Sequence, residues 1–401
     1  MIPPLIWDSF RRPPLRSKFL PVSSISFVLT IALSFIVATS FLGCSNGTTT
    51  TGVSYLGTGG PGDVWNWTLD RTAGKFNATN ITKNFTYSGT LSVLSTGYLQ
   101  LTLGSTTDPN ATVGQTLFAL ELPNTAVLLQ QFSKAPGCCS GTGMAAPIIV
   151  AAAQGSCPTS GATYNFVELP SANWNSSSSA SYGTATSSLS GGQFSFSVSS
   201  STLGGSATAS SASGFTCTNG KLTSGSSALT FGVAPSGDFI SDFGGSVASA
   251  TGAAGAIAPS SPITVSSLTS ADYLGFAFLS AYSDAGHPTP VPMTISVGAG
   301  PTKFGATGSA NLINAGQVAP TNGTPSGQIT MTVGTQISPG LFNIQFSQTC
   351  SNSVLDTQPG VIAVNQVNGK FVIFGVGVPV CTSGVPTTST TLGQNFMLIQ
   401  Q

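Results

Sequence analysis

The chain has 401 residues, with 11 Lys and Arg, 11 Asp and Glu and one His, so only 5% of it is charged and the formal net charge is zero. Ordinary soluble domains carry about 25% charged residues. The zero net charge argues against nucleic-acid binding, which needs clustered Lys and Arg to displace the counterions of phosphate. One histidine leaves little material for acid–base catalysis, and the 40% apolar content excludes a wholly disordered chain.

The N-terminal segment has the order of an export signal. Residues 1–18 contain four basic side chains, and an uncharged apolar run follows from Ile25 to Leu42. A small residue, Gly43, then precedes Cys44. A basic region, an apolar region and a small residue before the cleavage point together predict a segment that directs export.

Residues 1–44 resemble the precursor of a bacterial lipoprotein, in which the signal is cut before a cysteine that receives diacylglycerol. Gly43 and Cys44 match the box of that family, and Phe41 stands where Leu is usual. The resemblance implies a signal peptide over residues 1–43, lipidation of Cys44 and a membrane as partner, at the bacterial outer membrane or cell surface. An uncleaved signal anchor and ordinary secretion are alternatives. All three place residues 45–401 outside the cytoplasm.

Alternation of apolar and polar residues dominates the rest of the chain. The runs lie at 99–103, 194–198, 229–233, 291–297, 329–333 and 342–346. A period of two is typical of half-buried strands. Asn219-Gly220 and Asn368-Gly369 are dipeptides favoured in two-residue hairpin turns, because both central residues need positive φ. The sequence therefore predicts an all-β protein.

We expect two antiparallel β-sandwich or β-barrel domains, over residues 57–245 and 269–401. Residues 44–56 are interpreted as a tether and residues 246–268, which lack charge and aromatic side chains, as a linker. The Ser-rich stretch 176–188 is interpreted as a long loop. A faint internal repeat begins at Tyr164 and again at Tyr273, and it would make the two domains related copies.

The cysteines indicate an oxidising compartment. Lipidation of Cys44 would leave six, which suits three disulfides. Cys350 and Cys381 are the pair of the last third of the chain, so we expect them to bond. For the other four we expect Cys138 and Cys139 to bond to Cys157 and Cys217 rather than to each other, because a vicinal disulfide strains the backbone. The chain has no C-x-x-C motif, and we expect no metal site and no cofactor.

Three tryptophans are the candidates for ligand contact. Trp65 and Trp67 are two residues apart, so in a strand both rings lie on one face, where they would stack on a sugar or pack in a core. Trp174 is the third candidate. No pattern marks catalytic residues, so we expect a non-catalytic exported protein that binds an extracellular glycan or protein, or has a structural role. The alternative is a secreted hydrolase that uses a carboxylate pair.

Overall fold

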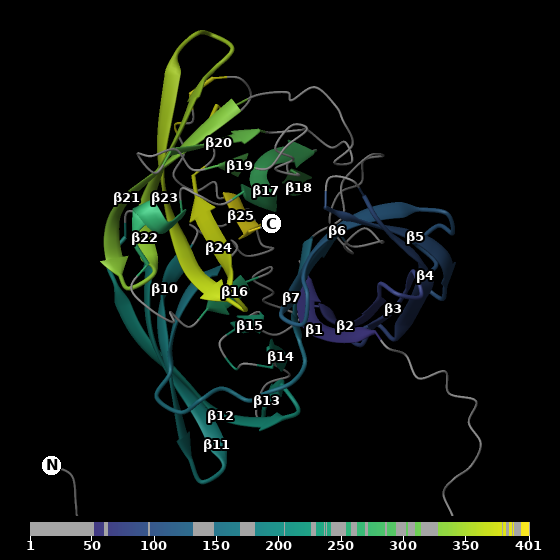
Figure 1. The fold of residues 1–401 in the computed structure, drawn as a ribbon. Coiled ribbons are helices and arrows are strands. Elements are labelled where there is room, and N and C mark those ends of the chain that lie inside the picture. Colours follow the sequence, from purple (N-terminus) through teal and green to yellow (C-terminus); the bar gives the residue numbers. More distant parts are fainter. Residues whose placement is uncertain are drawn as a thin grey trace, which may run out of the picture. The chain divides into compact units, whose positions relative to one another are not determined.

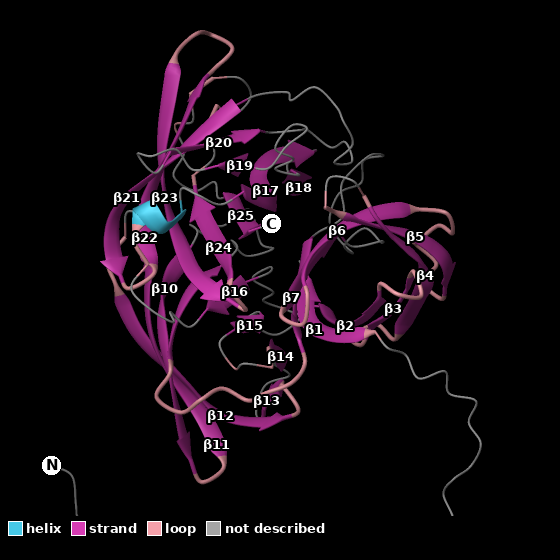
Figure 2. Cartoon of the chain, in the orientation of Figure 1, coloured by secondary structure: helices cyan, strands magenta, loops and turns pink. Residues whose placement is uncertain are grey.

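In the computed structural model, most of the described chain is β-strand, and α1 (Val265–Leu268) is a single helical turn (Figure 2). The chain divides into two units, Met1–Thr50 and Thr51–Gln401. The structure describes residues 52–59, 63–94, 97–130, 148–168, 181–203, 205–225, 230–235, 237, 239–241, 254–257, 263–268, 272–284, 287–293, 302–303, 309–313, 328–378, 380–381, 385–386, 388 and 394–400. Within these residues no helix has the length and apolar character needed to span a membrane.

The first eight strands form a closed antiparallel barrel, here called barrel 1, in which each strand pairs with the next and the last pairs with the first. Figure 1 shows this ring of strands nearly end-on. Its strands are β1 (Val53–Gly59), β2 (Asp63–Asp70), β3 (Lys75–Asn80), β4 (Phe85–Val93), β5 (Leu99–Thr106), β6 (Thr116–Leu122), β7 (Ala126–Gln130) and β8 (Ile148–Ala153).

Side chains at alternate positions of the strands point into barrel 1 and fill its interior. Trp65, Trp67 and Leu69 of β2 are buried, whereas the residues between them are partly exposed. The same period applies to Leu99, Leu101 and Leu103 of β5, which join the same core cluster. Eight strands enclose a space that side chains can fill, and here large aromatic and aliphatic side chains occupy it.

The next eight strands form a second closed barrel, barrel 2. Its interior cluster is rich in phenylalanine and includes Phe196, Phe215 and Phe231. Its strands are β9 (Thr163–Glu168), β10 (Ser181–Ser190), β11 (Gln193–Thr202), β12 (Thr208–Thr218), β13 (Lys221–Ser224), β14 (Thr230–Val233), β15 (Phe239–Ser241) and β16 (Ala254–Ile257).

The remaining strands form a nine-stranded antiparallel sheet, sheet 3, in the order β18-β17-β25-β24-β23-β22-β21-β20, with β19 paired to β17. Its strands are β17 (Asp272–Asp284), β18 (His287–Met293), β19 (Thr302–Lys303), β20 (Ser309–Ile313), β21 (Gln328–Ser338), β22 (Leu341–Thr349), β23 (Leu355–Val367), β24 (Lys370–Gly377) and β25 (Gln394–Gln400). One face of the sheet and α1 enclose a further core cluster.

A fourth core cluster joins all three sheets within the unit Thr51–Gln401. Leu120 and Ala152 contribute from barrel 1, Val167 from barrel 2, and Phe374 and Met397 from sheet 3. The odd-numbered residues of β6 point into barrel 1, so Leu120 belongs to its outer face. The barrels therefore bury apolar side chains in two places: in their own interiors, and on outer faces that pack against the other sheets.

The all-β prediction is confirmed, and so are both hairpin turns. Asn219 and Gly220 join β12 to β13 with φ of 50° and 74°, and Asn368 and Gly369 join β23 to β24 with φ of 50° and 79°. The alternating runs at 99–103, 194–198, 329–333 and 342–346 lie in strands.

The predicted connections contain strands. β1 begins at Val53, inside the tether expected over 44–56, and β16 lies inside the linker expected over 246–268, where it pairs with β9 and closes barrel 2. The loop expected over 176–188 contains β10 from Ser181 onward. The buried positions of β10 are Gly183, Ala185 and Ser187, which are small and so give no apolar alternation in the sequence.

Candidate functional site

The two tryptophans of β2 lie inside barrel 1. Trp65 and Trp67 are both 0% exposed, and their ring centroids are 5.7 Å apart. Trp65 also packs on Tyr87, and Trp67 on Phe76. These rings form part of the core and offer no face to a ligand in solvent. The third tryptophan candidate, Trp174, and the lipidation candidate Cys44 lie outside the described residues.

A buried polar cluster lies at the end of barrel 1 where β6 turns into β7. The Tyr55 hydroxyl donates to Oε1 of Glu121, and Nε of Arg71 lies 2.5 Å from Oε2 of the same carboxylate. The Glu121 side chain is 2% exposed and that of Arg71 41%. Burial raises the pKa of Tyr55 well above its ordinary value, and the negative charge of Glu121 adds to this. The cluster fixes Glu121 between a neutral hydroxyl and a cation.

Two more buried carboxylates also have partners of their own. Asp108 accepts hydrogen bonds from the Tyr87 hydroxyl at 2.6 Å and from the Asn110 backbone at 2.9 Å. Asp356 accepts from Nε2 of Gln358 at 2.7 Å and from the Cys381 backbone at 2.8 Å. Each carboxylate thus accepts hydrogen bonds from donors in its own sheet and in a segment next to it, as buried acids usually must.

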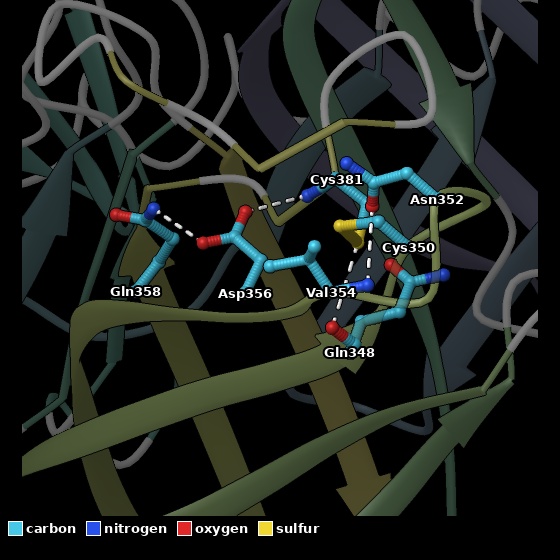
Figure 3. The surroundings of a disulfide bond; sticks show 7 residues. All are labelled: Gln348, Cys350, Asn352, Val354, Asp356, Gln358 and Cys381. Atoms are coloured by element: carbon cyan, nitrogen blue, oxygen red, sulfur yellow. Dashed lines mark hydrogen bonds between the residues drawn. A yellow bond between two sulfur atoms is a disulfide. The ribbon is translucent and has the colours of Figure 1, made fainter.

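Asp356 belongs to a small cluster around the disulfide of Cys350 and Cys381 (Figure 3). The loop after Cys350 is closed by a hydrogen bond from the Cys350 backbone N–H to the Val354 carbonyl, 2.9 Å long. Oδ1 of Asn352 accepts from the Val354 backbone at 3.1 Å. Asp356 then holds the backbone of Cys381, so the cluster connects β23 to the segment that follows β24.

The sulfur atoms and the Asp356 carboxylate in this cluster lie within 4.8 Å of one another, a spacing that suits a metal ion. A metal binds thiolate, not disulfide sulfur. Because Cys350 and Cys381 are bonded to each other, the cluster is a covalent cross-link supported by hydrogen bonds.

The second disulfide corrects the expected connectivity. Cys157 bonds to Cys217, with Cα atoms 5.8 Å apart, so these residues do not bond to Cys138 and Cys139. Cys157 precedes β9 and Cys217 lies in β12, so the folded barrel 2 brings them together, which spacing along the chain cannot indicate. Cys138 and Cys139 lie outside the described residues. The bond between Cys350 and Cys381 is confirmed.

Two disulfides indicate an oxidising compartment, because thiols in the cytoplasm are kept reduced. The folded part of the chain therefore belongs to an extracytoplasmic environment.

The outer side of barrel 2 carries an ordered array of hydroxyl groups, which we call the hydroxyl face. One row crosses four neighbouring strands and consists of Thr163, Thr186, Ser197 and Ser211, which are directly paired in register and all exposed. Thr184 pairs with Ser199, and Ser188 with Ser195, in the rows on either side. The hydroxyl face is thus defined by Thr163, Thr184, Thr186, Ser188, Ser195, Ser197, Ser199 and Ser211.

The geometry of the hydroxyl face is regular. Neighbouring strands in a sheet are about 4.8 Å apart, and residues on one side of a strand repeat about every 6.7 Å. The oxygen atoms of Thr163 and Thr186 lie 3.0 Å apart, so the row is continuous across β9 and β10. A hydroxyl group both donates and accepts, so the array can match either polarity of hydrogen bond.

The hydroxyl face has no charge of its own. Between Glu168 and Lys221 the sequence contains no Asp, Glu, Lys, Arg or His. This surface was not among the sites expected from the sequence, although Ser and Thr at every second position of 184–188 and 195–199 are its signal. No known protein family model matches the chain, and no curated protein sequence matches it.

Proposed function

We propose that this chain is an exported, lipid-anchored, non-catalytic protein that binds neutral polysaccharide through the hydroxyl face of barrel 2. The observation that carries the proposal is the exposed row of Thr163, Thr186, Ser197 and Ser211, of which the last three lie in the stretch without charged residues between Glu168 and Lys221. A surface without charge gives no electrostatic attraction to phosphate, sulfate or carboxylate groups. Its hydroxyls complement the hydroxyls of an uncharged sugar.

A repeated array favours a polymer over a single sugar. A hydrogen bond formed at an exposed surface replaces a bond to water, so its net contribution is only about 0.5–1.5 kcal/mol. The buried rings of Trp65 and Trp67 add no stacking on a sugar. Affinity must then come from many weak contacts made at once, which a chain with repeating units can provide.

The non-catalytic role is supported by the surroundings of the buried acids. Glu121, Asp108 and Asp356 each accept hydrogen bonds from donors of their own sheet. A hydrolase that uses two carboxylates needs both of them at one cleft, with room for the sugar between them. The observed partners suit stabilisation of the folded chain.

The anchor is inferred from the resemblance of residues 1–44 to lipoprotein precursors. The intact mass of protein extracted from membranes tests it. We expect a chain that begins at Cys44 and carries added acyl mass. A chain that retains residues 1–43, or one that begins at Cys44 without acyl mass, would contradict the anchor and leave the binding proposal untouched.

Polysaccharide binding is tested with the purified protein on insoluble cellulose and chitin and on soluble dextran and mannan. A variant with Thr186→Lys, Ser197→Lys and Ser211→Lys places three charged side chains on the hydroxyl face. Its control carries Thr90→Lys, Ser92→Lys and Thr116→Lys, at exposed positions of barrel 1.

We expect the native protein to bind at least one of these polymers, the face variant to bind about tenfold more weakly or worse, and the control to bind like the native protein. Failure of the native protein to bind any of the four, or equal binding by the face variant, would contradict the proposal.

A further inference from the structure

The first strands of the three sheets correspond to one another. β1, β9 and β17 each pair with the strand that follows and with the last strand of the same sheet. Each holds one fully buried tyrosine that points into the interior: Tyr55, Tyr164 and Tyr273. These three tyrosines are separated by the same number of residues along the chain.

The closing strands correspond as well. The residue after each tyrosine pairs with the last strand, as Leu56 with Ala152, Asn165 with Ile257 and Leu274 with Ile399. The hairpin before the last strand contains a residue at positive φ in every sheet, namely Asn124, Gly237 and Gly369. Sheet 3 also approaches closure, because β19 pairs with β17 and contacts β20.

Contacts between the sheets follow one rule. β1 and β8 of barrel 1 contact β14 and β15 of barrel 2. β9 and β16 of barrel 2 contact β23 and β24 of sheet 3, and β17 of sheet 3 contacts β6 of barrel 1. In every case the first or last strand of one sheet contacts the hairpin that precedes the last strand of the next sheet. The sheet that follows sheet 3 in this order is barrel 1.

Contacts between the sheets follow the same order at a second turn, which lies between the fifth-last and fourth-last strands of each sheet. Nδ2 of Asn165 in β9 donates to the Pro339 carbonyl at 2.6 Å, in the turn between β21 and β22. The Tyr98 hydroxyl, just after the turn between β4 and β5, donates to the Gly275 carbonyl of β17 at 2.7 Å. In barrel 2 the equivalent turn holds Gly220, where a Cβ would collide with the backbone of Gly155 after β8.

We infer that the three sheets are three copies of one barrel unit, each of which binds the next through the same surface, in a ring that closes after three copies. A head-to-tail interface generates a closed ring when its rotation closes, and an open filament otherwise. The partner of this surface is the next unit of the same chain. Because each copy already has both of its neighbours, no copy of the interface is left for a second molecule.

The apolar cluster shared by the three sheets is the centre of this ring. It takes Ala152 from a last strand, Val167 and Leu274 from first strands, and Ala126 and Phe374 from penultimate strands. These positions belong to the same classes of strand in the three copies, which explains why outward-facing Leu120 of β6, Val167 of β9 and Leu274 of β17 are apolar and buried.

The experiment cuts the connection between the first two copies in the full chain. A protease recognition sequence inserted between Ser160 and Gly161, both exposed, separates barrel 1 from the rest after cleavage. The disulfide between Cys157 and Cys217 still joins the fragments, so dithiothreitol is then added. Size-exclusion chromatography with light scattering measures mass, and circular dichroism reports whether the fragments remain folded.

We expect the uncut protein to be a monomer and the cut, reduced protein to elute as one folded complex of the same mass. Leu274→Lys, at the contact between sheet 3 and barrel 1, should raise the dissociation constant of the fragments on the order of tenfold or more, because it buries a charge. Ser197→Lys, on the exposed hydroxyl face, should leave it unchanged. Folded fragments that separate after reduction, or a native protein that is dimeric or larger, would overturn the inference.

Discussion

Barrels 1 and 2 have the same number of strands and the same order, yet different interactions stabilise them. The interior of barrel 1 is filled by stacked aromatic rings, among them Trp65 and Trp67, and by the buried cluster of Tyr55 and Glu121. Barrel 2 closes with four strands of only three or four residues, β13 to β16. A disulfide links Cys157, in the segment that precedes its first strand, to Cys217 in β12.

This difference shows that closure of an eight-stranded barrel does not require one kind of core. Long strands with large side chains bury enough apolar surface to stabilise the folded state. Short strands form fewer ladder hydrogen bonds, and a cross-link lowers the entropy of the unfolded chain instead. Barrel 2 can therefore combine a polar outer surface with small inward residues on β10, such as Gly183 and Ala185, beside the phenylalanines of its interior.

The largest expected effect comes from emptying the core of barrel 1. Trp67→Ala should lower the free energy of unfolding by about 3–5 kcal/mol, because it removes a fully buried ring and leaves a cavity. Ile81→Ala, at a side chain that is 46% exposed, should change it by less than about 0.5 kcal/mol. Urea denaturation followed by circular dichroism measures both free energies. Equal effects of the two substitutions would contradict the assignment of Trp67 to the core and of Ile81 to the surface.

The next effect distinguishes the two cross-links. Cys157→Ala with Cys217→Ala should cost about 3–4 kcal/mol, because the bond closes a loop with a sequence separation of 60 residues. Cys350→Ala with Cys381→Ala should cost about 0.6 kcal/mol less, since its separation is 31. Hydrogen exchange should show the first pair loosening β12 to β16 more than barrel 1, and uniform loosening would argue against a specific role in barrel 2.

Alkaline pH provides a third test. Burial raises the pKa of Tyr55, Tyr98 and Tyr273 above the ordinary value of 10.0. These tyrosines stabilise the fold fully below pH 10, and that contribution is lost as the pH rises from 10 toward the raised values. Each should lower the free energy of unfolding by about 1.4 kcal/mol per pH unit in this range.

Denaturation midpoints at pH 8, 10 and 11 measure this loss. Tyr55→Phe should reduce the loss of unfolding free energy above pH 10 by the contribution of one tyrosine, because a phenylalanine does not ionise. A midpoint that does not change between pH 8 and 11 would contradict the burial of the three hydroxyls.

The smallest expected effect lies in sheet 3, at a hairpin that contacts barrel 1. Gly369 has φ of 79° and a Cβ there would meet nothing within 4 Å, so Gly369→Ala should cost about 1 kcal/mol through backbone strain alone. Its neighbour Asn368 donates to Oγ1 of Thr125 at 2.5 Å. Gly225→Ala, at a glycine without positive φ, is the control and should change stability by less than about 0.5 kcal/mol.

The sequence predicted strands where an interior side chain is large. Leu99, Leu101 and Leu103 alternate with polar residues, and this alternation marks β5 directly. It failed at β10 and β16, where the residues that would alternate are Gly, Ala or Ser. Two domains were therefore expected where the structure has two barrels and a third sheet, and residues 246–268 were interpreted as a linker although β16 completes barrel 2.

The candidate site was harder to predict for a related reason. The two-residue spacing of Trp65 and Trp67 places both rings on one side of a strand. It does not show whether that side faces a core or solvent, and in the structure it faces the core. The hydroxyl face depends on the register between β9, β10, β11 and β12, which local sequence does not encode. The bond between Cys157 and Cys217 depends in the same way on how barrel 2 closes.

Hydrogen–deuterium exchange of the native protein, with and without a soluble neutral polysaccharide such as dextran or mannan, is the most direct test of polysaccharide binding by the hydroxyl face. We expect slower exchange in β9 to β12, around Thr186, Ser197 and Ser211, and unchanged exchange in barrel 1. The absence of protection with either polymer, or protection confined to barrel 1 or sheet 3, would contradict a binding role for the hydroxyl face.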